Sequence, residues 1–206
     1  MFKKIIIIIC LFFLTGCALS INDMSYEEII DMNLSENSLS NVNSIGYKYY
    51  LPINFSVYED DKYNQILLSD NNLYYMHVDV VSYHYKRNIT SERSQNDYKY
   101  YTFNKNGKNG YLKITKNNDY FFVELCYNYA IIEVEVEESN LRYAISRGMN
   151  ILKSIEYNDL VIEKIINDGE SEIRETVYKI PEPEKKITKN ILEYIDEDEE
   201  ESEDEE

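Results

Sequence analysis

The stretch YFFVELCYNYAIIEVEVEESNLRYAISRGMNILKSIEY, residues 120–157, contains the pattern that decides the fold. It opens with an apolar run that is typical of a strand. A second segment, residues 131–136, then alternates, so that Ile132, Val134 and Val136 share one face. Because successive side chains of a strand point to opposite faces, this spacing predicts a strand with one buried side.

A helix is predicted directly after these two strands. Ser139 is its candidate N-cap, and apolar residues recur at helical spacing over residues 141–152. Residues 154–157 then indicate a final short strand, and residues 160–166 a last short helix. Strands combined with one main helix predict an α+β domain, in which the helix packs on an antiparallel β-sheet.

Upstream of this stretch the sequence predicts further strands and one short helix. Ser25 and Glu28 fit a capping box, so a helix is expected over residues 26–34, followed by a loop over residues 35–44. The other strands are predicted over residues 47–51, 55–58, 63–68, 73–85, 98–103 and 111–115. Two Asn-Gly dipeptides before residue 111 predict a hairpin turn. The whole globular domain is expected to cover residues 25–167.

The N-terminus has the layout of an export signal. Two lysines precede an apolar run over residues 5–14, which is too short to span a bilayer comfortably. Leu14-Thr15-Gly16-Cys17 follows and resembles the bacterial lipobox. The resemblance implies that Cys17 is lipidated and that the signal peptide, residues 1–16, is removed, leaving residues 17–24 as a tether. Two or more acyl chains anchor a protein stably. We therefore expect the mature protein to be held by the lipid on Cys17 at the extracytoplasmic face of the cell membrane.

Two other interpretations of this segment remain open. Gly16 and Ala18 are small enough for an ordinary signal peptidase to cut after Ala18. Alternatively, residues 5–21 are marginally long enough to stay in the membrane as an uncleaved anchor.

The three cysteines agree with export followed by lipidation. Cys10 leaves with the signal, Cys17 is acylated, and Cys126 is then alone, so no internal disulfide is expected. Cys126 lies within a strand-like run that has no nearby histidine. We therefore expect a core or half-buried side chain there rather than a nucleophile.

Negative charge is concentrated at the C-terminus. The 206-residue chain carries a formal charge of −17. Ten of the eleven residues 196–206 are acidic, which argues against nucleic-acid binding because such a block repels phosphate. Residues 168–206 are predicted to be a flexible acidic tail that is a solvated spacer, a charged stop, or a binding site for cations or a basic partner. Within it, residues 187–195 have an apolar helical face that would dock on the domain or on a partner.

Three segments of the sequence, residues 46–52 (GYKYYLP), 78–83 (VDVVSY) and 127–130 (YNYA), resemble a group of small lipoproteins of low-GC Gram-positive bacteria. That group has no assigned activity, so the resemblance implies export, lipidation and a shared domain over most of residues 25–167. The order of strands, main helix and closing strand is also similar to the PsbP-like α+β fold. This second likeness rests on element order alone, and function does not follow from it.

Few residues offer catalytic chemistry. The only histidines are His77 and His84, and a strand over residues 73–85 would place His77 and Asp79 on one face. There the carboxylate could orient the imidazole for base catalysis or form half of a metal site, although a solvated pair is the simpler interpretation. A zinc site needs three or four converging ligands, and the available histidines and cysteines are too few to supply them.

Three other motifs have a structural and a functional interpretation. Asn88-Ile89-Thr90 fits the glycosylation sequon, which is expected to be a coincidence in a bacterial exported protein. The tyrosine-rich residues 98–101 would form either an aromatic platform for a glycan or peptide, or ordinary sheet packing. The acidic residues 59–61 are expected to form a turn rather than a calcium site.

The sequence therefore predicts a membrane-anchored, extracytoplasmic, non-enzymatic binding or assembly module. No catalytic residue, metal or cofactor is assigned. Its expected partners are the membrane, through Cys17, and an unidentified protein, and no nucleic acid. One alternative is an enzyme that uses His77 and Asp79, and another is a surface factor that recruits a basic partner through the acidic tail.

Overall fold

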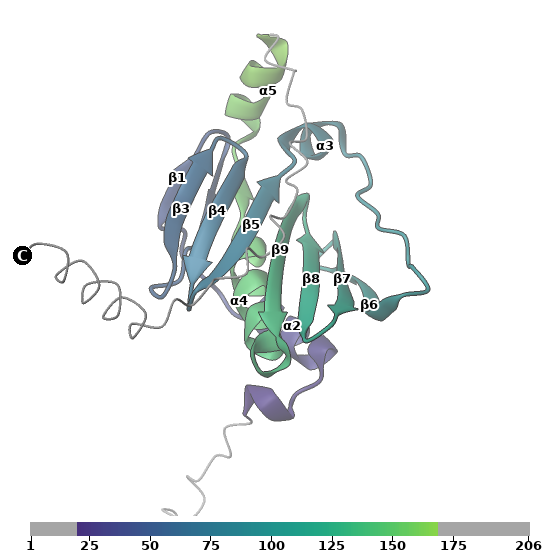
Figure 1. The fold of residues 1–206 in the computed structure, drawn as a ribbon. Coiled ribbons are helices and arrows are strands. Elements are labelled where there is room, and N and C mark those ends of the chain that lie inside the picture. The colour runs from purple at the N-terminus through teal and green to yellow at the C-terminus, as the bar shows by residue number, and fades with distance from the viewer. Residues whose placement is uncertain (1–19, 169–206) are drawn as a thin grey trace, which may run out of the picture. The chain divides into compact units, whose positions relative to one another are not determined.

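The computed structural model describes residues 20–168, which form an α+β domain, as predicted (Figure 1). The signal segment, Cys17 and residues 169–206 lie outside the described residues. The helices are the 3₁₀ turns η1 (Ile21–Asp23) and η2 (Glu138–Asn140) and the α-helices α2 (Tyr26–Ser35), α3 (Val80–Tyr85), α4 (Leu141–Lys153) and α5 (Asp159–Asn167). None of the described helices is long and apolar enough to cross a membrane. η1 lies inside the segment for which a tether was predicted.

The strands form two antiparallel sheets. The large sheet has the order β3-β4-β5-β9-β8-β7-β6 and contains β3 (Ser56–Asp61), β4 (Asn64–Ser69), β5 (Asn72–Val78), β6 (Asp97–Lys105), β7 (Lys108–Asn117), β8 (Tyr120–Tyr127) and β9 (Ala130–Glu137). The small sheet has the order β1-β2-β10 and contains β1 (Val42–Ser44), β2 (Tyr47–Tyr49) and β10 (Glu156–Tyr157). Two meanders, β3 to β5 and β6 to β9, meet where β5 pairs with β9. β6 is therefore an edge strand.

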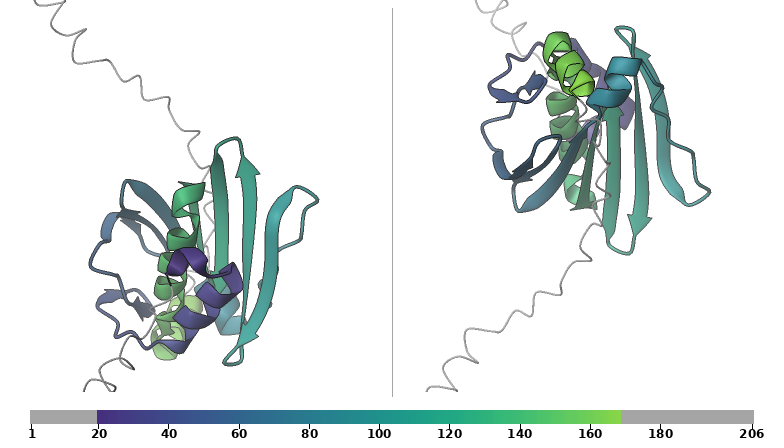
Figure 2. Two further views of the ribbon diagram at one scale, coloured as in Figure 1. Left: turned by 90° about the horizontal axis from the view of Figure 1, so that it is seen from below. Right: turned by 90° about the horizontal axis from the view of Figure 1, so that it is seen from above.

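The main helix α4 packs against the centre of the large sheet, with α2 beside it on the same face (Figures 1 and 2). The buried strand residues that make up this inner face alternate along β5, β8 and β9, as period-two spacing requires. They are Tyr74, Met76, Val78, Phe121, Val123, Leu125, Ala130, Ile132, Val134 and Val136. The alternation predicted from residues 131–136 is thus confirmed, and it positions the core.

A glycine brings α4 close to the sheet. A Cβ atom on Gly148 would lie 2.7 Å from Cδ1 of Leu125, which is fully buried and pairs with Ile132 across β8 and β9. No real Cβ contact is that short, so the helix reaches this depth because position 148 has no side chain.

Both helices that were predicted with caps are present, and one cap differs. The capping box of Ser25 and Glu28 at the start of α2 is confirmed. The N-cap of α4 is Asn140 rather than Ser139, because residues 138–140 first form the 3₁₀ turn η2. The loop predicted over residues 35–44 contains the short strand β1, which pairs with β2. The acidic residues 59–61, predicted as a turn, belong to β3.

The predicted strand over residues 73–85 is wrong in its second half. β5 ends at Val78, and Val80–Tyr85 form α3. The carboxylate of Asp79 caps this helix by accepting a hydrogen bond from the Ser82 N–H at 2.7 Å. Packing also favours the helix, since the Tyr83 ring stacks on Tyr157 at 3.8 Å between centroids. Tertiary contacts and the cap therefore override the β-propensity of this segment.

Candidate functional site

His77 and Asp79 do not share the strand face on which their pairing was predicted. Because the strand ends at Val78, Asp79 caps α3, whereas His77 stays on β5. Nδ1 of His77 lies 2.7 Å from Oδ1 of Asn64 on the neighbouring strand β4. Each side chain therefore has a structural contact of its own, and the geometry proposed for base catalysis is not present.

Cys126 is buried in β8, as predicted, and only 2 % of it is exposed. Burial raises the pKa of its thiol to about 12, and the nearby Glu124 carboxylate adds to this shift. The thiol therefore stays protonated and unreactive near neutral pH. Among residues 20–168, no three acidic, histidine or cysteine side chains are grouped so as to hold a metal ion.

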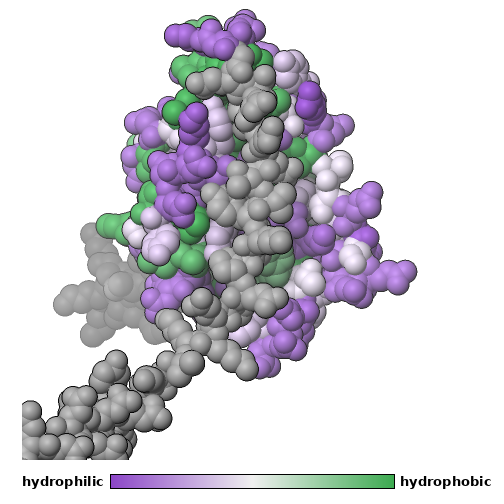
Figure 3. Space-filling view, turned by 45° about the horizontal axis from the view of Figure 1, so that its top comes forward, coloured by the Kyte–Doolittle hydropathy of each residue, from purple (hydrophilic) through white to green (hydrophobic). Residues whose placement is uncertain are grey.

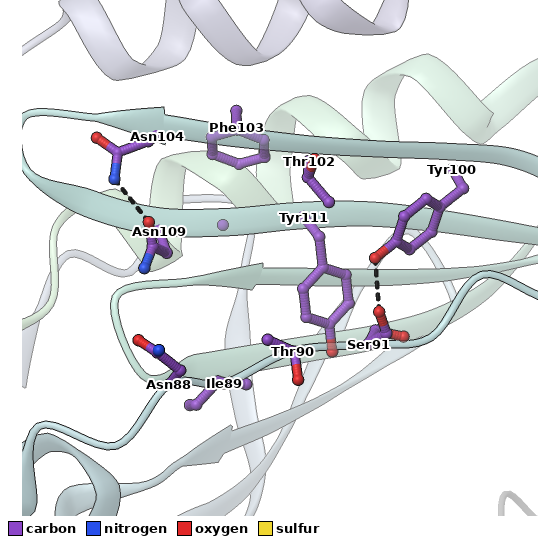
Figure 4. A pocket seen from close by; sticks show the side chains of 11 residues that line it. Asn88, Ile89, Thr90, Ser91, Tyr100, Thr102, Phe103, Asn104, Asn109 and Tyr111 are labelled. Carbon is purple, nitrogen blue, oxygen red and sulfur yellow. Dashed lines mark hydrogen bonds between the residues drawn. The ribbon is translucent and has the colours of Figure 1, made fainter.

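An open pocket lies on the face of the sheet that points away from α4, where residues 88–91 cross the hairpin of β6 and β7 (Figure 4). Its volume is about 440 Å³, which is within the usual range for small-molecule sites. The residues that line it are Asn88, Ile89, Thr90, Ser91, Tyr100, Thr102, Phe103, Asn104, Asn109, Gly110 and Tyr111. Thr102 projects into the space between Tyr100 and Tyr111.

Two hydrogen bonds fix the walls of this pocket. The Tyr100 hydroxyl donates to the backbone oxygen of Ser91 at 2.6 Å and so ties the crossing segment to β6. At the other end, Nδ2 of Asn104 donates to Oδ1 of Asn109 at 2.6 Å, across the hairpin (Figure 4). The pocket is therefore held between two strands and a tethered segment rather than by a free loop.

Tyr111 forms the inner wall, and its hydroxyl donates to the carboxylate of Glu124 on β8. Burial raises the pKa of Tyr111, and the hydrogen bond and charge of Glu124 raise it further. The phenol therefore stays neutral at physiological pH. Below it, Gly110 leaves room for the Phe103 ring, because a Cβ atom there would lie 2.5 Å from the ring.

The lining is rich in hydrogen-bonding groups and carries no formal charge. Side-chain amides and hydroxyls each supply donors and acceptors, and the aromatic rings and Ile89 add apolar surface. None of the eleven lining residues is an Asp, Glu, His, Lys or Arg. Such a surface suits the binding of an uncharged, hydroxyl-rich or amide-rich group better than acid–base catalysis.

A larger pocket of about 690 Å³ lies at the end of the domain between β2, β10 and α5. Leu160 and Val161 of α5, 80 % and 38 % exposed, are among its walls. Hydrophobic residues reach the surface at this end of the domain (Figure 3). Unlike the hairpin pocket, it is lined by the charged side chains of Lys48, Glu156 and Asp159, and Lys48 pairs with Glu156 at 2.9 Å.

The sequence drew attention to parts of the hairpin pocket without joining them. Asn88-Ile89-Thr90 fits a sequon, Tyr100 belongs to the tyrosine-rich run, and Asn109 belongs to one of the two Asn-Gly dipeptides that predicted a turn. What these segments share is a local excess of Asn, Thr and Tyr. Because Asn and Tyr are abundant throughout the chain, that excess did not indicate a site. Neither the models of known protein families nor the curated proteins include a match to this chain.

Proposed function

We propose that the protein is a membrane-anchored, extracytoplasmic binding module whose ligand site is the hairpin pocket of residues 88–91, β6 and β7. The pocket itself carries this proposal: an open space of about 440 Å³ with an uncharged lining of amides, hydroxyls and rings. Binding without covalent chemistry is what such a lining supports best.

The lipobox-like Leu14-Thr15-Gly16-Cys17 and the likeness to small Gram-positive lipoproteins support the anchored location. The 3₁₀ turn η1 begins at Ile21, four residues after Cys17. A fully extended chain advances by about 3.5 Å per residue, so a lipid on Cys17 would hold η1 within about 14 Å of its attachment point. The module would therefore work close to the membrane surface.

Filling the pocket should strongly weaken ligand binding. Thr102 is exposed and projects into the pocket, so Thr102→Trp would occupy the ligand's place without disturbing the core. Detergent-solubilised full-length protein would be incubated with the small-molecule fraction of its own cell envelope and weighed by native mass spectrometry. We expect a ligand adduct on the wild type that Thr102→Trp reduces by at least about tenfold, the cost of losing roughly 1.4 kcal/mol.

The matched control is Asn117→Trp, which adds the same bulk to an exposed position at the far end of β7. It should keep the adduct of the wild type. Equal adducts on both variants, or none on the wild type, would contradict the proposed site.

A further inference from the structure

The hairpin pocket has two ends that carry different hydrogen-bonding groups (Figure 4). At one end lie the side-chain amides of Asn88, Asn104 and Asn109. At the other end the hydroxyl of Tyr100 meets Ser91 of the crossing segment. The hydrogen bonds already made at each end decide what that end still offers to a ligand.

The hydrogens of the hydroxyl end are already engaged. The Tyr100 hydroxyl donates to the backbone oxygen of Ser91, and the Tyr111 hydroxyl donates to Glu124. Burial and Glu124 raise the pKa of Tyr111, whereas the Ser91 hydroxyl lowers it, as a donor to the phenol oxygen does. Because a hydroxyl has a single hydrogen, these three groups can only accept further hydrogen bonds. This end of the pocket therefore matches a donor on the ligand.

The amide end keeps donors to spare. Nδ2 of Asn104 donates one hydrogen to Oδ1 of Asn109 at 2.6 Å. Within residues 20–168 this is the only hydrogen bond made by either side chain, and the Asn88 side chain makes none. Each amide nitrogen carries two hydrogens, so those of Asn109 and Asn88 remain available. Donors outnumber the remaining acceptors, which are the oxygens of Asn88 and Asn104, and this end therefore matches an acceptor on the ligand.

We propose that the pocket binds an uncharged secondary amide, with its carbonyl toward Asn88 and Asn109 and its N–H toward Tyr100 and Ser91. In a trans amide the C=O and the N–H point in opposite directions, so one planar group serves both ends of the pocket. A hydroxyl donates and accepts at one oxygen and cannot bridge the two ends in this way. The inference rests on the proposed function, since it names the ligand class of the same site.

Two sources can supply such an amide, an N-acylated sugar and a peptide, and matched probes distinguish them. Equilibrium dialysis of the detergent-solubilised full-length protein would compare N-acetylglucosamine with glucose, which differ only at C2. It would also compare N-acetylalanine methylamide with its counterpart in which both nitrogens are methylated. In at least one pair the probe with the N–H amide should bind about fivefold or more tightly, the effect of one hydrogen bond of ordinary net strength. The pair that shows the preference identifies the source.

Asn109→Asp should remove this preference. The substitution keeps an oxygen for Asn104 but replaces the donating nitrogen with a second carboxylate oxygen, which repels a carbonyl. Glucose should bind at least as tightly as before, since its hydroxyls can donate to the carboxylate. Asn106→Asp is the matched control, because it adds the same charge to the same hairpin outside this pocket and should keep the preference.

Equal binding within both pairs, binding of no probe, or a preference that Asn109→Asp leaves intact would overturn the secondary-amide inference. If Thr102→Trp still reduces the envelope adduct in that case, the proposed function stands. If it does not, both fail.

Discussion

Leu125→Ala is expected to lower the free energy of unfolding by about 2–5 kcal/mol, the usual cost of truncating a fully buried leucine. Leu125 has no exposed surface and lies where β8 meets α4, so the cavity left behind cannot fill with water. Urea denaturation followed by circular dichroism would measure the loss.

The same site makes a sharper prediction through Gly148. In the wild type, Gly148→Ala should destabilise, because the new Cβ would lie 2.7 Å from Cδ1 of Leu125 in a closed core. In the Leu125→Ala background that atom is absent, and Ala should then stabilise the helix by up to about 1 kcal/mol over Gly. Gly148→Ala with the same sign in both backgrounds would contradict the packing of α4 on β8.

Gly110→Val is expected to cost about 3 kcal/mol or more and to disrupt the hairpin pocket, since overpacking here cannot relax. A Cβ atom at Gly110 would meet the Phe103 ring at 2.5 Å and the backbone oxygen of Cys126 at 2.7 Å. The oxygen cannot retreat because Gly110 pairs with Tyr127 in the β7–β8 ladder. Thermal unfolding and the ligand-adduct measurement would report the two effects.

Gly107→Asn is the matched control in the same hairpin. Gly107 has a φ of +71°, but a Cβ there would meet nothing within 4 Å. Because Asn tolerates the left-handed region, the cost should stay under about 1 kcal/mol. If Gly107→Asn destabilises as much as Gly110→Val, close approach at Gly110 is not the cause.

The centre of the fold could be predicted because two independent periodicities describe one interface. The buried residues of β9 repeat at every second position, namely Ile132, Val134 and Val136. The buried residues of α4 repeat at helical spacing, and the two sets pack against each other. The capping box at Ser25 was equally predictable, since both of its hydrogen bonds are local.

The second half of the predicted 73–85 strand failed because the deciding contacts are distant in sequence. Val80, Val81 and Tyr83 favour strands locally, yet Tyr83 stacks on Tyr157 and its hydroxyl donates to Asp159 at 2.8 Å. The pairing of His77 with Asp79 rested on that strand and failed with it.

The pocket could not be predicted for a related reason. It forms where residues 88–91 cross β6 and β7, and the sequence does not reveal that β6 is the edge strand or that the Tyr100 hydroxyl reaches Ser91. Its residues were visible only as separate turn, sequon and aromatic signals. Side chains in a motif become a site when the sheet order brings them together.

The most direct test of an extracytoplasmic, ligand-occupied pocket is the labelling of single cysteines in intact cells with a membrane-impermeant maleimide. Thr102→Cys reports the pocket and Asn117→Cys the exposed end of β7, while the buried Cys126 should stay silent. We predict that Cys at 117 is labelled equally fast in cells and in purified protein, whereas Cys at 102 is labelled several-fold more slowly in cells, where ligand covers it. No labelling before lysis, or the same ratio of the two rates in cells and after purification, would contradict the account.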